Sequence, residues 1–240
     1  MSDALFLVDA LPDDDHLVLD GPEGHHAATV ARMRVGESLL IGDGHGTVAR
    51  ARVTAVGKGT LTVTLGERRV EPAPTPRIVV AQGIAKGDRG ELAVQAMTEV
   101  GVDAIVPWAA ARSVARWTSP RPHQRWVATA REAAKQSRRA WVPVVEPMAS
   151  TRELVGRATA AGGATFVLHE EATLALSSVP LPAQGDILLV VGPEGGITPE
   201  ELAAFQSAGA QAVRLGPHVL RTSTAGPAAI AVLSVRLGRW

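Results

Sequence analysis

The stretch Ile187-Leu-Leu-Val-Val-Gly-Pro-Glu-Gly-Gly-Ile-Thr-Pro-Glu-Glu201 combines three features that together indicate the fold. Its first five residues are all apolar, which is typical of a strand buried on both faces of a parallel sheet. Thr198-Pro-Glu-Glu201 is a capping box with proline at the first helical position, so a helix begins there. The glycine-rich loop Gly192 to Gly196 therefore joins a buried strand to a helix. In open α/β sheets ligands bind beyond this edge, which makes the loop a candidate ligand site.

The same alternation of strand and helix extends from Arg77 to the end of the chain. It predicts strands near 78–81, 105–107, 165–168, 187–191 and 213–215, and helices near 88–100, 124–138, 199–208 and 224–236. Within the first helix, Leu92, Ala96 and Val100 are expected to lie on one stripe. Apolar strands that alternate with helices predict an α/β domain, with a mostly parallel sheet covered on both faces.

The chain before Arg77 has a different pattern. Short β-type segments at 5–8, 17–19, 38–42, 47–54 and 60–65, with one helix near 25–34, predict a small β-barrel. Gly42-Asp-Gly-His-Gly46 is followed by a strand pattern and is interpreted as a hairpin turn rather than a phosphate loop. Three prolines in Glu71-Pro-Ala-Pro-Thr-Pro76 then interrupt the pattern. We therefore expect one domain over 1–72 and a second over 77–240.

Two further loops are expected at the same sheet edge as Gly192 to Gly196. One follows the strand that ends at Leu215, contains Gly216 and Arg221, and leads to a helix with Ser and Thr caps. The other follows Leu168 and carries His169 and Glu170. Three loops of one sheet can meet in one pocket, although the residues alone leave plain β–α turns as an equal alternative. The known phosphate-loop and dinucleotide fingerprints are absent, which argues against kinase-type and dinucleotide-dependent chemistry.

Composition narrows the class of protein. The 240 residues are 46% hydrophobic and 20% charged, as expected for an ordinary soluble globular protein. No apolar run approaches the ~20 residues of a membrane span, and no signal peptide is visible, so a cytoplasmic protein is expected. The absence of cysteine excludes disulfides, thiol nucleophiles and cysteine-based metal sites. The seven histidines show no i, i+4 pair, so no metal site is expected.

A formal net charge of +0 conceals a basic segment between residues 112 and 139. The segment has one acidic residue, Glu132, and eight basic ones: Arg112, Arg116, Arg121, Arg125, Arg131, Lys135, Arg138 and Arg139. Four tryptophans lie in or beside it: Trp108, Trp117, Trp126 and Trp141. This combination favours a site for a polyanion such as RNA. The competing interpretation is a solvated helix face with tryptophans in the core.

Two C-terminal motifs carry a resemblance to a known family. Val191-Gly-Pro-Glu-Gly-Gly-Ile-Thr-Pro-Glu-Glu-Leu202 and Leu215-Gly-Pro-His-Val-Leu-Arg-Thr-Ser-Thr-Ala225 resemble the RsmE family. Lys86-Gly-Asp-Arg89, Arg131-Glu-Ala-Ala-Lys-Gln-Ser-Arg138 and His26-Ala-Ala-Thr-Val-Ala-Arg-Met-Arg34 also match in order. The family consists of SPOUT-class methyltransferases that act on N3 of a uridine in 16S ribosomal RNA. One departure is Ser223, where many members have glutamate.

The resemblance implies the architecture and the partners. It implies a PUA-like β-barrel RNA-binding domain followed by a SPOUT α/β domain with a C-terminal trefoil knot. It also implies S-adenosylmethionine as cofactor, the small ribosomal subunit and its 16S rRNA as partner, and an obligate homodimer. Carried over residue by residue, the expected cofactor contacts are Leu168, His169, Glu170, Gly192, Gly196, Leu215, Gly216, Leu220, Thr222 and Thr224.

Chemistry at uracil N3 suggests roles for three side chains. N3 carries a proton at neutral pH, so the site needs a base, or a cation that stabilises charge on the flanking carbonyl oxygens. We expect Arg221 to supply the cation and Glu194 to orient the substrate or accept the proton, with His169 as the alternate. A purely structural alternative for Glu194 is stabilisation of a helix N-terminus.

The RNA contacts are expected on both domains. The candidates are Arg32, Arg34, Arg112, Arg116, Arg125, Arg131, Lys135, Arg138 and Arg139, with Arg50 and Arg52 as weaker ones. Two other functions stay open at this point. The chain could be a non-catalytic RNA-binding ribosome-assembly factor, or a SPOUT methyltransferase with a different RNA target.

Overall fold

The computed structural model describes residues 3–158 and 162–240. The chain divides into two compact units. The first comprises Met1–Ala73 with Ala134–Val142, and the second comprises Pro74–Ala133 with Pro143–Trp240. The short segment 134–142 thus packs with the N-terminal unit although it lies far along the sequence. No pattern in the sequence indicated that this segment belongs with the first unit.

The first unit is built on a five-stranded sheet with the order β1-β3-β4-β5-β2. Its strands are β1 (Leu5–Leu7), β2 (His16–Leu19), β3 (Ser38–Gly42), β4 (Thr47–Val56) and β5 (Leu61–Val70). Only the β1–β3 pair is parallel. Side chains from all five strands, such as Phe6, Leu19, Ile41, Val53 and Val63, meet in one core, as the inside of a small barrel requires.

In this unit the predicted hairpin turn is confirmed, whereas the predicted bounds of the helix are not. Gly42–Gly46 does connect the antiparallel strands β3 and β4, and Asp43 Oδ1 accepts hydrogen bonds from the backbone N–H groups of His45 and Thr47. The predicted helix 25–34 is wrong in its bounds. An α-helix, α1 (Gly21–His25), begins earlier, with Pro22 in its first turn, and continues into a π-helical turn, η1 (His26–Val30). Arg32 then adopts a φ of 54°, a left-handed conformation that ends the helix.

The second unit has an eight-stranded sheet in which every pair is parallel, which confirms the predicted sheet type. The strand order is β11-β13-β10-β12-β6-β7-β8, with β9 also paired to β7. The strands are β6 (Arg77–Gly83), β7 (Ala104–Ala109), β8 (Val144–Val145), β9 (Ala149–Ser150), β10 (Ala164–Leu168), β11 (Leu174–Ala175), β12 (Asp186–Val191) and β13 (Gln211–Arg214).

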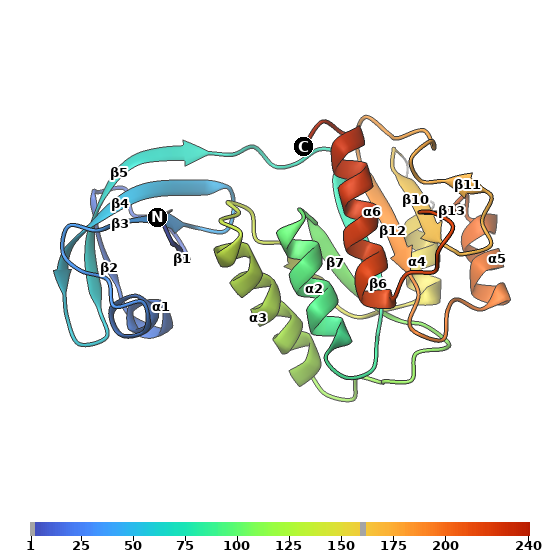
Figure 1. Ribbon diagram of the computed structural model, residues 1–240, viewed down its shortest axis with the longest axis horizontal. Coiled ribbons are helices and arrows are strands. Elements are labelled where there is room, and N and C mark those ends of the chain that lie inside the picture. Colours follow the sequence, from blue (N-terminus) through green and yellow to red (C-terminus); the bar gives the residue numbers. More distant parts are fainter. Residues whose placement is uncertain (1–2, 159–161) are drawn as a thin grey trace. The chain divides into compact units, whose positions relative to one another are not determined.

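Helices cover both faces of this sheet. Those that pack on one face are α2 (Arg89–Glu99), α3 (Arg121–Gln136) and α6 (Thr222–Arg236), and those on the other are α4 (Thr151–Ala158) and α5 (Pro199–Ser207). Alternate residues of each strand point to opposite faces, so Ile78 and Val80 pack with α2 and α6, whereas Val79 and Ala81 pack with α4 and α5. Figure 1 shows α2 and α6 side by side across the first face.

The predicted stripe on α2 is only partly confirmed, because Val100 packs on the core and Ala96 is half-buried but Leu92 is not buried. Leu92 is 55% exposed, and the buried residues are its neighbours Ala93, Val94 and Met97. The face turned inward is the one that meets α6, where a Cβ on Gly226 would lie 2.7 Å from Met97 Sδ. The periodicity of the sequence predicted an apolar stripe along α2. It did not show which of two adjacent stripes on this helix packs against α6.

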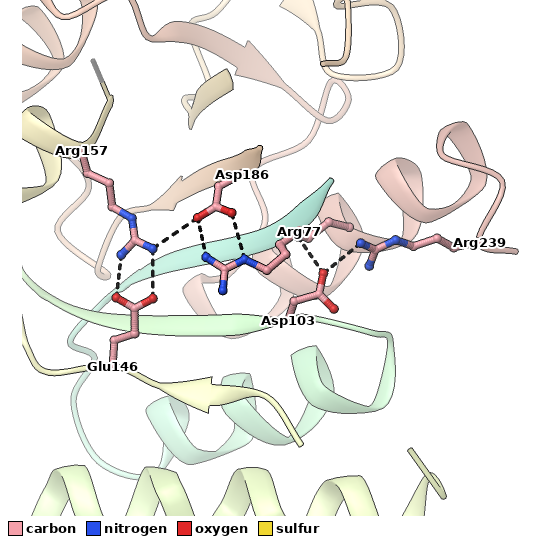
Figure 2. Close-up of polar contacts among 7 residues, drawn as sticks. Arg77, Asp103, Glu146, Arg157, Asp186 and Arg239 are labelled. Atoms are coloured by element: carbon pink, nitrogen blue, oxygen red, sulfur yellow. Dashed lines mark hydrogen bonds and ion pairs between the residues drawn. The ribbon is translucent and has the colours of Figure 1, made fainter. Parts of the chain in front are cut away.

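Ion pairs gather at the amino edge of the sheet, near the starts of β6 and β12 (Figure 2). Arg77, the first residue of β6, donates from Nε and Nη2 to the two carboxylate oxygens of Asp186, at 2.9 and 2.8 Å. Arg157 makes a second two-bond pair with Glu146 and also approaches Asp186 at 3.5 Å. This network fixes the edge away from the candidate site, so we interpret it as structural.

The network makes stability depend on pH. Hydrogen bonding from Arg77 holds the pKa of Asp186 below its ordinary value although partial burial acts the other way, and Arg157 lowers it further. A lowered folded-state pKa stabilises the protein above the unfolded value, and this contribution is lost as the pH falls through the folded value. We predict that Asp186→Asn flattens the dependence of the unfolding free energy on pH between about 5 and 2. Urea unfolding measures this, with Asp9→Asn, outside the network, as control; equal slopes for wild type and Asp186→Asn would contradict it.

Candidate active site at the carboxyl edge of the sheet

The loops after β6, β7 and β12 pack backbone against backbone at the carboxyl edge. A Cβ on Gly83, the last residue of β6, would lie 2.5 Å from the backbone nitrogen of Pro193. A Cβ on Gly195 would lie 2.9 Å from Cβ of Arg112 in the loop after β7. Real Cβ atoms do not approach other atoms so closely, so only glycine permits these contacts. The glycines of this loop thus bring three strand ends together.

The start of α5 holds the glycine loop from its other side. Thr198 Oγ1 accepts from the backbone N–H of Glu201, and the Glu201 carboxylate accepts from the N–H of Thr198, which confirms the predicted capping box. Within the loop, Gly196 adopts a φ of 74° and its N–H donates to the Pro193 carbonyl. A strand, a tight turn and a capped helix therefore define this loop.

Glu201 also connects the loop to the neighbouring strand. The residue is only 7% exposed, and its carboxylate accepts from the backbone N–H of Ala111 at 2.9 Å and from Thr151 Oγ1 at 2.8 Å. These bonds fix the loop that carries Arg112, whose guanidinium donates to the Gly195 carbonyl at 3.1 Å. The sequence indicated the helix cap but not this second role.

We predict that Glu201→Ala lowers the free energy of unfolding by about 3 kcal/mol, because hydrogen bonds to a charged group contribute about 1.5–3 kcal/mol each and the donors would stay buried. The adjacent, exposed Glu200 provides a matched control. Glu200→Ala should cost far less than Glu201→Ala, because solvent screens an exposed charge near a helix N-terminus. Urea denaturation of both variants measures the difference, and equal losses would contradict the assigned role of Glu201.

Glu194 is held by the loop after β6. Its Oε1 accepts from the backbone N–H of Lys86 at 3.1 Å and from Arg89 Nη1 at 3.2 Å. A quarter of the side chain is exposed. Because Oε1 takes both bonds, Oε2 is the oxygen that can face a bound molecule. The structure thus connects Glu194 to Lys86-Gly-Asp-Arg89, which the sequence could not do.

The loop after β13 is open to solvent. Residues 216–221 are exposed, and α6 begins at Thr222 rather than at 224. The predicted Ser or Thr side-chain cap is also wrong, because Arg221 is the N-cap residue and no side chain caps this end. The Arg221 carbonyl accepts from the N–H groups of Thr224 and Ala225. The backbone of Arg221 is therefore fixed by these hydrogen bonds, while the residue itself is exposed to solvent.

Thr222 joins this loop to the glycine loop. It is 8% exposed, and its hydroxyl donates to the Gly192 carbonyl at 2.7 Å. The same hydroxyl accepts from Nε2 of Gln82, a residue the sequence predictions did not include. Of the candidate cofactor contacts, Thr222 and Gly192 are therefore in direct contact.

The third predicted loop, after β10, lies on the same edge. The N–H of His169 donates to the Val213 carbonyl, and His169 Nδ1 accepts from the N–H of Glu171. His169 lines a shallow cavity of about 390 Å³ together with residues of β13 and α5, among them Gln206 and Gln211. Leu168 and Leu215 pack partly on the core. Over residues 3–158 and 162–240 no hydrogen bond or ion pair links His169 to Glu194 or Arg221.

The basic segment separates into exposed and structural residues. Arg112, Arg116 and Arg138 are exposed, and Arg125 is exposed beside Glu91, with which it forms an ion pair. Lys135 is different: its side chain is 7% exposed and pairs with Glu23 at 2.8 Å inside the first unit. Burial in this pair removes Lys135 from the surface, so we withdraw it as an RNA contact.

The tryptophans near that segment serve mainly as core. Trp108 and Trp126 are fully buried, and Trp117 packs edge-on against Trp126 with ring centroids 5.0 Å apart. Trp141 Nε1 donates to the Glu71 carbonyl. The core interpretation of these tryptophans is therefore correct for the buried pair. Arg32, Arg34, Arg50 and Arg52 are exposed in the first unit, and Arg131 and Arg139 are partly exposed.

Two protein-family models match different parts of the chain. An RNA methyltransferase domain model matches residues 71–234, and an RNA methyltransferase PUA domain model matches residues 19–66. Ribosomal RNA small subunit methyltransferase E of Mycobacterium bovis is 49% identical, over 98% of this chain and 93% of its own length. The chain belongs to this RsmE family. The Bacillus subtilis member is 32% identical over 90% of the chain and 88% of its own length.

Solved structures of the family agree with the fold. The Neisseria gonorrhoeae enzyme of this name, bound to S-adenosyl methionine, superposes with a TM-score of 0.89 at 30% identity, over 98% of both chains. A putative methyltransferase from Legionella pneumophila in complex with the same cofactor gives 0.88 at 26% identity, again over 98% of both chains. The fold is therefore that of the SPOUT methyltransferases with a PUA-like domain.

Two further structural findings concern other classes of site. Within residues 3–158 and 162–240, no helix combines the length and apolarity needed to cross a bilayer. Over the same residues, no group of three or more His, Asp or Glu side chains is arranged to hold a metal ion.

Proposed function

We propose that this S-adenosylmethionine-dependent rRNA methyltransferase transfers the methyl group to N3 of one uridine in the 16S rRNA of the small ribosomal subunit. The observation that carries the proposal is the close contact of Gly83 and Gly195 with neighbouring loops at the carboxyl edge, in a chain of this family. The hydrogen bond from Thr222 to the Gly192 carbonyl adds a further loop. The Neisseria relative binds S-adenosyl methionine, and the Mycobacterium relative is named for the small subunit.

The residues at this edge fit such a cofactor. A Cβ on Gly196 would meet nothing closer than Arg112 Nη1 at 3.8 Å, so a flat ligand can approach the backbone of this residue closely. Gly192 faces the Ile197 side chain instead, and its carbonyl accepts from the Thr222 hydroxyl. Leu168, Leu215 and Leu220 offer apolar surface, since the first two are partly exposed and Leu220 is exposed. We propose that these residues, with His169, Glu170, Gly216, Thr222 and Thr224, hold the cofactor. When bound, S-adenosylmethionine supplies an electrophilic methyl group on a sulfonium.

Arg221 is proposed to stabilise negative charge on uracil O2 or O4 as N3 loses its proton. Its exposed guanidinium follows the open loop 216–220, and its backbone is fixed as the N-cap of α6. A fixed cation aimed at developing charge is among the most effective catalytic devices. Oε2 of Glu194 is proposed to orient the base or accept the N3 proton, because Lys86 and Arg89 hold the other oxygen. His169 is the alternate proton acceptor.

RNA is proposed to bind through exposed arginines of both units. These are Arg32, Arg34, Arg112, Arg116, Arg125 and Arg138, with the partly exposed Arg131 and Arg139 as weaker contacts. Guanidinium groups pair with phosphate through two hydrogen bonds, which suits this purpose. We further propose residues 1–72 as the RNA-binding domain and 77–240 as the catalytic one. Family resemblance supports a trefoil knot, a homodimer and a cytoplasmic location.

We predict a strong salt dependence of RNA binding. Three phosphate contacts with single-stranded RNA give a slope near −2 in log K against log salt, or roughly a 16-fold loss of affinity between 50 and 200 mM. Arg125→Ala should make the slope shallower by about 0.7, whereas Arg152→Ala, an exposed arginine of α4, should not change it. Filter binding measures both slopes, and a profile that is flat with salt would contradict the proposed surface.

Analysis of methylated nucleosides tests which atom is modified. Small subunits that lack the modification are incubated with the protein and labelled S-adenosylmethionine, and the rRNA is digested for mass spectrometry. We expect label in 3-methyluridine. Label in a ribose-methylated or C5-methylated nucleoside would overturn the proposed acceptor while leaving the enzyme class intact.

A further inference from the structure

Gln82 is a polar residue that directly follows four buried, apolar residues of β6, 78–81. It lies next to last in β6, and its side chain is fully buried. Its Nε2 donates to Thr222 Oγ1 at 2.9 Å, with the carbonyls of Gly83 and Thr222 at 3.3 and 3.4 Å. Thr222 Oγ1 in turn donates to the Gly192 carbonyl at 2.7 Å. A chain of hydrogen bonds thus runs from β6 to the glycine loop.

The direction of this chain is fixed by the donors available. A threonine hydroxyl has one hydrogen, which Thr222 uses on the Gly192 carbonyl, so Oγ1 can only accept from Gln82. The two nearby carbonyls are acceptors as well, so only the NH₂ end of the amide fits there. The reverse orientation of the amide would place its oxygen against three acceptors.

Packing alone does not account for a glutamine at this position. Its Oε1 is buried without a hydrogen-bond partner in the part of the chain that the structure describes, close to Gly226 of α6. A buried, unpaired amide oxygen costs stability, and an apolar side chain of similar size would avoid that cost. The contact of Nε2 with Thr222 is what distinguishes glutamine from such a residue.

Thr222 connects two loops that carry the candidate site. It directly follows Arg221 and its hydroxyl holds Gly192, the first residue of the glycine loop. Gln82 fixes that hydroxyl from the rigid end of β6, next to Gly83, whose backbone contacts Pro193. The position of one hydroxyl therefore affects both loops.

We propose that Gln82 is a positioning residue for cofactor binding, acting through Thr222 on the Gly192 carbonyl. Gln82 does not touch the cofactor; it keeps Thr222 and Gly192 in the arrangement that the cofactor requires. The inference rests on the proposed cofactor site at this edge. It does not depend on which RNA atom receives the methyl group.

Calorimetric titration with S-adenosylmethionine tests the proposal. Gln82→Met keeps the size of the side chain and removes its donor, and we expect the cofactor Kd to rise about fivefold to tenfold, with Tm unchanged or higher. Gln95→Met, an exposed glutamine of α2, is the matched control and should leave Kd within twofold. An unchanged Kd for Gln82→Met would overturn the proposal.

Variants of Thr222 separate the relay from a general loss of packing. Thr222→Val removes the hydroxyl at constant shape and should raise Kd, whereas Thr222→Ser should restore it. In the double variant Gln82→Met with Thr222→Val, the two effects should not add, because both break the same chain. Additive effects, or no rescue by serine, would overturn the relay even if Gln82→Met did not fold.

Hydrogen exchange of the free protein distinguishes failure of this inference from failure of the proposed function. Gln82→Met should accelerate exchange of the amides in 192–197, where Gln95→Met should not. If wild-type protein binds no S-adenosylmethionine, the proposed function fails, but the exchange rates still test the relay. Unchanged exchange in Gln82→Met would then contradict it.

Discussion

Arg221→Ala is expected to lower the rate of methyl transfer by about 10²–10³-fold, the usual effect of removing one preorganised group that stabilises developing negative charge. The guanidinium is exposed and only the backbone of Arg221 supports α6, so the fold should tolerate the change. Kd for S-adenosylmethionine and the affinity for RNA should stay within about twofold. Single-turnover methylation of small subunits measures the rate apart from binding.

The control for this variant is Arg214→Ala, which removes an exposed arginine at the end of β13 close to the same loop in the sequence. Its rate should equal that of wild type. If Arg221→Ala turned over at the wild-type rate with unchanged RNA affinity, Arg221 would have no catalytic role. A loss confined to RNA affinity would instead assign Arg221 to the binding surface.

Gly83→Ala is expected to disrupt cofactor binding. The added Cβ would lie 2.5 Å from the nitrogen and 2.7 Å from the Cδ of Pro193. Both are ring atoms of this proline, so they cannot rotate away. The glycine loop must therefore shift. We predict at least a tenfold rise in Kd for S-adenosylmethionine and a loss of about 1–3 kcal/mol in unfolding free energy, typical of an overpacked site.

Gly156→Ala is the matched control. Gly156 lies in α4, and outside that helix's own backbone a Cβ there would meet no atom of residues 3–158 or 162–240 within 4 Å. Alanine favours the helix relative to glycine, so stability should stay equal or rise slightly, with Kd unchanged. Binding by Gly83→Ala at wild-type affinity would show that the contact with Pro193 does not shape the cofactor site.

The sequence contained enough to predict the architecture of the second unit. Strands such as Ile187–Val191 are continuous apolar runs, and the Thr198 capping box marks where α5 begins, because both signals are local. The elements that were not predicted, α4, β8, β9 and β11, are short and depend on packing with the main sheet. The start of α6 was placed late because its N-cap is Arg221, a residue without a typical capping side chain.

The candidate site was predictable only in part. Glycine loops at the ends of strands could be recognised, and the family resemblance supplied their role. Contacts between distant segments could not: Gln82 and Thr222 are 140 residues apart, and Lys135 and Glu23 are 112 apart. A buried lysine and an exposed one look the same in a run of basic residues. Only the tertiary structure separates the two.

The most direct test of this account is to map the modified nucleotide by reverse transcription. Small ribosomal subunits that lack the modification are incubated with the protein and S-adenosylmethionine, and their 16S rRNA is copied. A methyl group on N3 blocks Watson–Crick pairing, so the account predicts a new, strong stop at one uridine that is absent with Arg221→Ala. Methyl incorporation without any such stop would contradict the claim that this protein methylates uridine N3.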